Sequence, residues 1–394
     1  MRATRRHEWK LHRSVGLRPA ALGGPSLEPP VVTSVYYDVP GGALAAAGLT
    51  LLCRTGQGRT VWQLTLPTDG SHLELEEEGI PREPPQALRA LLQAHLRHGP
   101  LEPVAELRST RRSGALGGAA AEDPSAGSPF EELRSRLRHQ LHEIERHDPG
   151  TRLGRDPESL HDMRVGVRRL RALLRAGRQL VATDTSELDA RLKQLGRVLG
   201  EVRDLDVLLA RLEGEASELD GGDAQQARSL LAALRTERSC SRARLLGALR
   251  SDEYLALLDD TDRTIDDLEP SDAGAALDDL ADNAFAKLRK AVHALPDEPA
   301  DHELHAVRKK GKRARYAAEL ADWKKPVRRA KKLQDVLGEH QDAVVAAERL
   351  RQLAAEAPPQ KALAAGRLIQ REEEHRRESR AAWPKAWKKL RKTI

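Results

Sequence analysis

Hydrophobic residues recur at helical spacing through the last two thirds of the chain. Between positions 160 and 178, apolar residues follow steps of three and four, which places them on one face of a helix. They are Leu160, Met163, Val167, Leu170 and Leu174. Basic residues follow the same steps one position later, at His161, Arg164, Arg168, Arg171, Arg175 and Arg178. The pattern predicts a helix with a basic stripe roughly 26 Å long beside its apolar stripe.

This basic stripe needs a source of negative charge, because like charges four residues apart on a helix repel each other. One interpretation is an extended anionic ligand. The alternative is ion pairing with acids on neighbouring helices, since the chain holds 60 Asp and Glu residues.

The basic pattern occurs twice. LHDMRVGVRRLR at 160–171 matches LHAVRKKGKRAR at 304–315 with an offset of 144 residues. Farther on, LKQLGRVLGEVRD at 192–204 matches AKKLQDVLGEHQD at 330–342 with an offset of 138. The basic residues that correspond are His161 with His305, Arg164 with Arg308, Arg168 with Lys312, Arg169 with Arg313, Arg171 with Arg315, and Lys193 with Lys331. Such duplication predicts two similar helical units, each with one cationic stripe.

The first 112 residues have a different pattern, in which polar and apolar residues alternate as in half-buried strands. His7, Trp9 and Leu11 begin this alternation, and further strands are expected at 31–37, 49–54, 59–66, 72–77 and 104–110. Pro84 and Pro85 suit the first turn of a helix over 84–97. Residues 113–128 are rich in Gly, Ala, Ser and Pro, which is typical of a flexible linker.

The fold class is therefore α+β with two domains. A small, mainly-β domain over 1–112, a partial antiparallel tunnel or barrel, precedes an all-α domain over 129–394. Helices are expected from Phe130, from Pro157 with Asp156 as N-cap, and then at 185–201, 203–212, 223–249, 252–267, 274–295, 300–321, 325–355 and 359–393. Gly221 and Gly222 indicate a loop.

Composition narrows the function. A net charge of +6 and a pI of 9.3 are compatible with a polyanionic partner. Aromatic residues make up only 3%, which argues against proteins that stack single-stranded bases. No apolar stretch is long enough to span a membrane, and the N-terminus has no secretory signal. Cys53 and Cys240 define no disulfide framework or zinc site, so a reducing, cytoplasmic location is expected.

The paired motifs resemble those of the conserved histidine α-helical domain, or CHAD, family over about residues 129–394. The resemblance implies two four-helix bundles, over about 129–250 and 274–394, related by a pseudo-two-fold axis. It implies that inward basic residues bind inorganic polyphosphate without a cofactor. The residues that would do so are His161, Arg164, Arg168, Arg169, Arg171, Arg175, Lys193, His305, Arg308, Lys312, Arg313, Arg315 and Lys331.

The two histidines could contact phosphate or be structural. A metal site needs three or four converging ligands, and neither His161 nor His305 lies in a motif that supplies them. We therefore expect no metal there. Asp204 and Asp342 are expected to orient cations by ion pairing, and no residue is assigned a catalytic role.

A second resemblance concerns the N-terminal region. HEWKL, WQLTLP and LELEEEG are similar to segments of the CYTH, or triphosphate tunnel, family, which acts on triphosphates with Mg²⁺ or Mn²⁺. A residual triphosphate or metal site would comprise Glu8, Lys10, Arg54, Glu74 and Glu76. Three charged positions of the family differ in this chain: Arg6 stands in place of a glutamate, Leu52 in place of an arginine and Thr65 in place of a lysine. The later strands of the family are expected to be missing after about residue 112.

The sequence patterns are compatible with three functions. They favour a polyphosphate-binding protein rather than an enzyme. The alternative is a triphosphatase or polyphosphatase that requires Mg²⁺ or Mn²⁺, with the helical domain supplying substrate. Nucleic-acid binding is disfavoured by the low aromatic content and by the lack of a nucleic-acid motif.

Overall fold

The computed structural model describes residues 2–7, 32–56, 58–68, 71–109, 128–271 and 277–394. The chain forms two compact units, one of residues 1–124 with 142–163 and the other of residues 125–141 with 164–394. Residues 113–127 of the expected linker lie outside the described residues.

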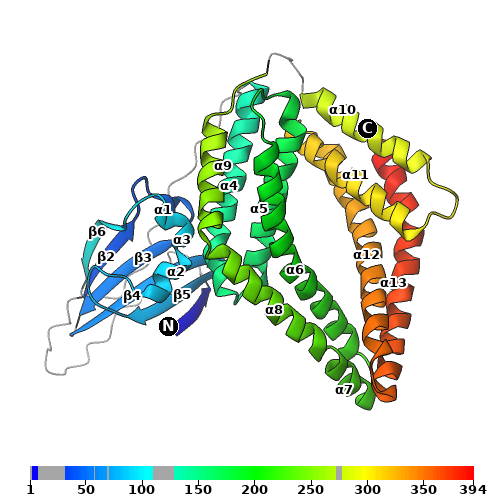
Figure 1. Cartoon of the computed structure of the whole chain (residues 1–394), viewed down its shortest axis with the longest axis horizontal. Helices are drawn as coiled ribbons and strands as arrows, with labels where there is room; N and C mark the ends of the chain where they lie inside the picture. The colour runs from blue at the N-terminus through cyan, green and yellow to red at the C-terminus, as the bar shows by residue number, and fades with distance from the viewer. Residues whose placement is uncertain (1, 8–31, 57, 69–70, 110–127, 272–276) are drawn as a thin grey trace, which may run out of the picture. The chain divides into compact units, whose positions relative to one another are not determined.

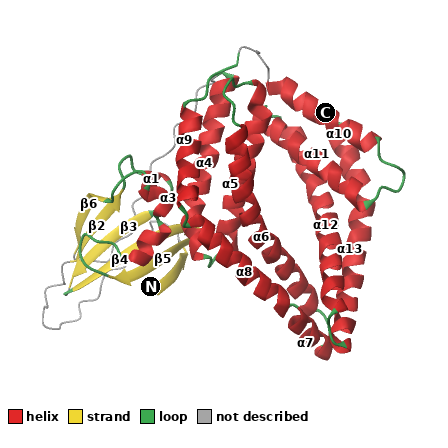
Figure 2. Cartoon of the chain, viewed as in Figure 1, coloured by secondary structure: helices red, strands yellow, loops and turns green. Residues whose placement is uncertain are grey.

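The first unit is built on a six-stranded antiparallel sheet (Figures 1 and 2). Its strands are β1 (Arg2–His7), β2 (Val32–Asp38), β3 (Thr50–Gly56), β4 (Arg59–Thr68), β5 (Ser71–Glu78) and β6 (Glu102–Ser109), in the order β1-β5-β4-β3-β2-β6. The strands expected between positions 31 and 110 are confirmed. The alternation expected from His7 to Leu11 continues into residues that are not described. Among the described strands, β1 and β6 are the two edges, so these strands form an open sheet.

Short helices cover one face of this sheet. They are α1 (Ala43–Ala46), α2 (Gln86–Leu91) and α3 (Gln93–Leu96). Trp62 is fully buried in the core beneath them, its ring centroid lies 4.8 Å from that of Tyr37, and its indole N–H donates to the carbonyl of Ile80. The single helix expected over 84–97 is instead two helices separated at Leu92, which is also fully buried.

The remaining chain is helical, as the periodicity predicts. Its helices are α4 (Pro129–Leu153), α5 (Pro157–Ala176), the 3-10 turn η1 (Gly177–Gln179), α6 (Ser186–Ser217), α7 (Gly221–Leu230), α8 (Ala232–Leu249), α9 (Asp252–Asp266), α10 (Leu277–His293), α11 (Asp301–Leu320), α12 (Lys324–Ala355) and α13 (Pro359–Arg391). None of the described helices is long and apolar enough to cross a membrane.

Three helix boundaries were predicted wrongly. The single helix expected at 223–249 divides at Leu231 into α7 and α8. The helices expected at 185–201 and 203–212 are one helix, α6, because Arg203 and Asp204 are polar but do not break a helix, and the buried positions continue through Val202 and Leu205. The expected loop at Gly221 and Gly222 is the start of α7. Gly221 has a φ of +34°, which a glycine adopts without the strain of a Cβ.

The duplication is visible in the helix bounds. The bounds of α11 are those of α5 shifted by 144 residues, and the bounds of α12 are those of α6 shifted by 138. The difference lies in the connections, because 177–185 joins α5 to α6 whereas only 321–323 joins α11 to α12. The shorter connection has no counterpart of η1.

One apolar cluster of the second unit draws on both repeats. It combines residues of α6, α7 and α8 with residues of α12 and α13, among them the fully buried Leu212, Leu350 and Leu368. Arg211 of α6 adds an ion pair to the fully buried Glu372 of α13 at 2.8 Å. The two repeats thus share a core at the end of α6 and α12 (Figure 1).

Candidate anion-binding site

Helix α5 presents its two stripes as the sequence predicts. Leu160, Met163, Val167, Leu170 and Leu174 are all buried, and the neighbouring basic residues are half-buried or exposed. The helix begins where expected, because Asp156 Oδ1 accepts the backbone N–H of Glu158 at 3.1 Å. The apolar stripe therefore fixes which way the basic stripe faces.

Every basic residue assigned to the site lies on one of four helices. His161, Arg164, Arg168, Arg169, Arg171 and Arg175 are on α5, Lys193 is on α6, His305, Arg308, Lys312, Arg313 and Arg315 are on α11, and Lys331 is on α12. Lys193 and Lys331 are exposed.

The two repeats build the same local contact. A Cβ on Gly200 of α6 would lie 3.6 Å from the guanidinium of Arg164, and a Cβ on Gly338 of α12 would lie 3.6 Å from that of Arg308. In both repeats the arginine thus lies close to the backbone of the following long helix. Arg164 donates to Asp204 at 2.8 Å, and the corresponding acid of the second repeat, Asp342, attracts Arg308 electrostatically.

Part of each stripe lines a common cavity in the second unit, whereas other residues assigned to the site do not line it, namely His161, Arg164, Arg169, Lys193, His305, Arg308, Arg315 and Lys331. The cavity has a volume of about 1130 Å³. Its lining residues are Arg168, Arg171, Ala172, Arg175, Ala176, Arg178, Gln179, Leu280, Asn283, Ala284, Lys287, Lys310, Lys312, Arg313, Tyr316 and Ala317. They belong to α5, η1, α10 and α11 (Figure 1). Eight of these residues are cationic and none is acidic.

Two cations of this site lack an acidic partner. Arg168 and Lys312 make no ion pair with any part of the chain that the structure describes, whereas Asp342 and Asp204 attract Arg308 electrostatically. Burial, and next the repulsion from nearby arginines, lowers the pKa of Lys312 to about 8. The repelling arginines are Arg308, Arg168, Arg164 and Arg315. Cations of α5 and α11 therefore lie close enough to destabilise each other's charge.

Other members of the stripes are paired with acids, so the alternative interpretation holds for part of the pattern. Asp189 of α6 accepts from Arg171 at 3.0 Å and from Arg175 at 2.7 Å. Arg315 pairs with Glu319 at 3.3 Å along α11. Because the one carboxylate of Asp189 serves two arginines, its pairing offsets only part of the charge at one end of the α5 stripe, and the middle of the site keeps its excess positive charge.

The surroundings of His305 favour its neutral form. Burial first, and then repulsion from Lys309, lowers the pKa of His305 below its ordinary value. Its Nδ1 atom is buried without a hydrogen-bond partner among the described residues. His161, the corresponding residue, is half-buried on α5.

The possible triphosphate site on the sheet is only partly described. Glu8 and Lys10 lie outside the described residues. The register places Arg54 of β3 and Glu74 and Glu76 of β5 on the sheet face opposite Trp62, and Arg54 lies 4.0 Å from Glu76. Thr65 lies opposite Glu74 in the ladder, at the position where the tunnel family has a lysine.

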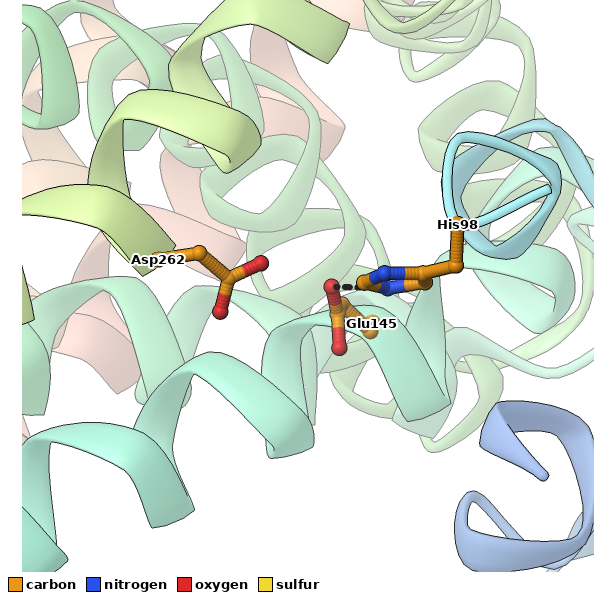
Figure 3. A group of neighbouring side chains, drawn as sticks. All are labelled: His98, Glu145 and Asp262. Carbon is orange, nitrogen blue, oxygen red and sulfur yellow. Dashed lines mark ion pairs between the residues drawn. The ribbon is translucent and has the colours of Figure 1, made fainter. Parts of the chain in front are cut away.

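Sequence reasoning missed a buried polar cluster in the first unit. Glu145 of α4 bonds the guanidinium of Arg97, and its Oε1 lies 3.6 Å from His98 Nε2 (Figure 3). His95 is nearly fully buried beside them, and burial lowers its pKa to about 4. No periodic pattern joins these residues, because they come together only when α3 packs on α4. Since Arg97 already neutralises Glu145, we assign the cluster a structural role.

The cavity also contains residues that were not predicted. Lys287 of α10, Lys310 and Tyr316 of α11, and Gln179 of η1 were not assigned to the site. Lys310 and Tyr316 could have been found from their spacing to Arg313, whereas Lys287 and Gln179 depend on tertiary packing.

These observations define a class of helical proteins in which two repeats direct their cations to one site. The chain belongs to the CHAD domain family, which matches residues 135–351. Two solved structures are similar. PptA from Streptomyces chartreusis has 27% identity and a TM-score of 0.56, over 66% of this chain and 99% of PptA. The CHAD domain from the plant Ricinus communis has 27% identity and a TM-score of 0.56, over 71% of this chain and 97% of that domain.

Two proteins of Mycobacterium tuberculosis are also similar. They are Uncharacterized protein MT2285 of strain CDC 1551 and Uncharacterized protein Rv2226 of strain H37Rv. Each is 32% identical over 252 residues, which make up 60% of this chain. The chain spans about half the length of these curated relatives, since the match covers 49% of each.

Proposed function

We propose that this protein binds inorganic polyphosphate at the cations that α5 and α11 share. One observation carries the proposal. Arg168, Arg308 and Lys312 crowd together, Arg168 and Lys312 have no ion pair among the described residues, and repulsion among the three helps to lower the pKa of Lys312 to about 8. Such a site is destabilised when empty, and an anion that contacts several cations at once removes the repulsion.

The chemistry of the site favours phosphate chains over nucleic acids. Arginines hold phosphate oxygens with two parallel N–H donors and lysines hold them as point charges. The cations follow one another at about one helical turn, roughly 5.4 Å, so successive side chains contact phosphates at intervals along a flexible chain. Tyr316 is the sole aromatic residue among those lining the cavity, so the site offers no row of rings on which successive bases stack. Cys53 and Cys240 are free thiols, which supports the cytoplasmic setting proposed from the sequence.

Calorimetric titration of the full chain tests the proposal. Long polyphosphate should bind more tightly than a DNA of matched total charge at the same salt concentration. Because part of each stripe lines one cavity, a polyphosphate long enough to cover both should bind with one event per protein and more tightly than a short one. Equal affinity for the DNA would refute the assignment, and two independent events per protein would refute a shared site.

A matched pair of variants separates specific from general charge effects. The double variant Arg164→Gln with Arg308→Gln removes one stripe cation from each repeat. The control, Arg250→Gln with Arg377→Gln, removes two exposed cations that belong to neither basic stripe. The first should lose most of the affinity and keep its helical circular dichroism, whereas the control should lose little. Equal losses would show that net charge alone determines binding.

The alternative function, turnover at the N-terminal sheet, has weaker support. Arg54, Glu74 and Glu76 share one sheet face, but Thr65 occupies the position of the family's lysine on that face. If the domain were active, acidic residues such as Glu74 and Glu76 would hold Mg²⁺ or Mn²⁺ and cations would hold the phosphates. We therefore place binding ahead of catalysis, with no cofactor needed for binding.

A further inference from the structure

The wall of the cationic cavity contains more than cations. Ala172 and Ala176 of α5, Leu280 and Ala284 of α10, and Ala317 of α11 also line it. An inorganic phosphate chain has no group that gains from contact with these side chains. Mixed walls of small apolar residues and a few polar groups are typical of pockets for organic ligands.

One polar group of this wall is buried and unsatisfied. The side chain of Tyr316 is 6% exposed, and its hydroxyl has no hydrogen-bond partner among the residues that the structure describes. Leaving such a hydroxyl unpaired costs about 1–3 kcal/mol. The hydroxyl has almost no accessible surface, so a ligand recovers this cost once the Tyr316 ring turns its hydroxyl toward the cavity. The Arg315 guanidinium lies 4.9 Å from the Tyr316 ring centroid, which is a cation–π contact.

Two amide side chains also line the cavity. They belong to Gln179 of η1 and Asn283 of α10, and both residues are exposed. An amide side chain offers a donor and an acceptor together, as does the edge of a nucleobase. The apolar wall, the two amides and the hydroxyl are therefore suited to a heterocyclic group rather than to phosphate.

The cavity is large enough for both parts of such a ligand. Pockets for small organic molecules measure about 300–1,000 Å³, and this cavity measures about 1130 Å³. Arg168 and Lys312 lie on its cationic side and make no ion pair with described residues. A phosphate chain at these cations would leave the apolar wall free for a group attached to its end.

We propose that the cavity binds nucleoside polyphosphates, with the phosphates on Arg168 and Lys312 and the nucleoside against Ala172, Ala284 and Tyr316. This inference rests on the proposed phosphate-binding function, and it adds a second ligand class that differs from inorganic polyphosphate in carrying a nucleoside.

A comparison of ATP with inorganic tripolyphosphate tests the inference, because both carry three phosphates. The full chain is titrated with each by calorimetry, without divalent cations and at constant salt. Tripolyphosphate is the more highly charged, so electrostatics alone predicts that it binds more tightly. The nucleoside contact reverses this order, and ATP should bind about tenfold more tightly.

Two variants locate the nucleoside. Ala172→Leu fills part of the cavity and should abolish the preference for ATP, while the control Ala306→Leu at an exposed position of α11 should retain it. Tyr316→Phe should weaken ATP about fivefold and raise the melting temperature of the free protein, because it removes an unsatisfied hydroxyl.

The outcomes separate the two proposals. Tripolyphosphate binding as tightly as ATP would overturn the inference and leave polyphosphate binding intact. A preference for ATP that survives Ala172→Leu would also overturn it, because the nucleoside would then lie elsewhere. Failure of long polyphosphate to bind at all would overturn the proposed function itself.

Discussion

Lys312 makes the proposed binding site sensitive to pH. In the free protein its pKa is lowered from an ordinary value of 10.5 to about 8, by burial first and then by the repulsion from Arg308 and other arginines. A bound polyanion neutralises that repulsion and holds the lysine in its charged form. Binding should therefore take up a proton when the pH is near or above 8, and affinity should fall as the pH rises.

The size of this effect follows from the pKa. If Lys312 is charged in the complex throughout, affinity should fall about tenfold between pH 7 and pH 9, which corresponds to about 1.4 kcal/mol. The free protein should show the opposite trend. Its lysine holds fewer protons when folded than when unfolded between about pH 8 and 10.5, so the stability of the fold should rise with pH in that window.

Titration calorimetry from pH 7 to 9.5 measures the fall, and titrations in two buffers of different ionisation enthalpy measure the proton uptake. The matched control is Lys312→Arg, because arginine stays charged throughout this range. Its affinity should be nearly flat with pH, and any titration of the ligand's terminal phosphates is common to both proteins. Parallel pH profiles for wild type and Lys312→Arg would refute the role of Lys312.

Further predictions concern salt, catalysis and packing. The logarithm of the association constant should fall linearly with the logarithm of salt concentration, and Arg308→Gln should reduce the magnitude of that slope by about 1, whereas an unchanged slope would remove Arg308 from the site. The full chain with Mg²⁺ or Mn²⁺ should release little phosphate from triphosphate, and robust turnover abolished by Glu8→Ala would contradict this. Gly177→Ala should cost about 1–3 kcal/mol in thermal or urea unfolding, because its Cβ would overlap the buried side chain of Leu133. Gly366→Ala meets no atom within 4 Å and should instead stabilise α13 by about 0.5–1 kcal/mol.

The sequence predicted the helices that carry the site because their apolar stripes are regular. Leu160, Val167 and Leu174 are buried as expected, so the neighbouring basic stripe has the expected direction. The matches at offsets of 144 and 138 residues recur as matching helix bounds. Local periodicity thus determined both the elements and the face of each that points to the cavity.

The duplication extends farther than the sequence comparison detected. At the same offset of 144, Leu137, Leu141 and Ile144 of α4 correspond to Ala281, Phe285 and Leu288 of α10. All six are buried, although none of the three pairs keeps the same residue. A core position requires an apolar side chain of suitable volume rather than a particular residue, so the repeat survives here in burial and not in identity.

Which cations are neutralised could not be predicted, because it depends on how side chains of different helices pack against one another. Arg171 and Arg175 both contact Asp189, whereas Arg168, on the same stripe, has no acidic partner among the described residues. Periodicity places all three arginines on one face but does not show which acids reach them. The excess charge at Arg168 and Lys312 is therefore a property of the packed helices.

The two repeats are alike in their cations but not in the wall around them. The connection from α5 to α6 is six residues longer than its counterpart, and it contains η1, which supplies Gln179 to the cavity together with Arg178. The chain from α11 to α12 turns within 321–323 and has no room for such a segment. An unbranched inorganic polyphosphate has two identical ends, so a symmetric pair of stripes would serve it equally well in either direction. A ligand with one organic end requires a site whose two ends differ. The extra segment of the first repeat, which contains η1, makes the two ends of this cavity different.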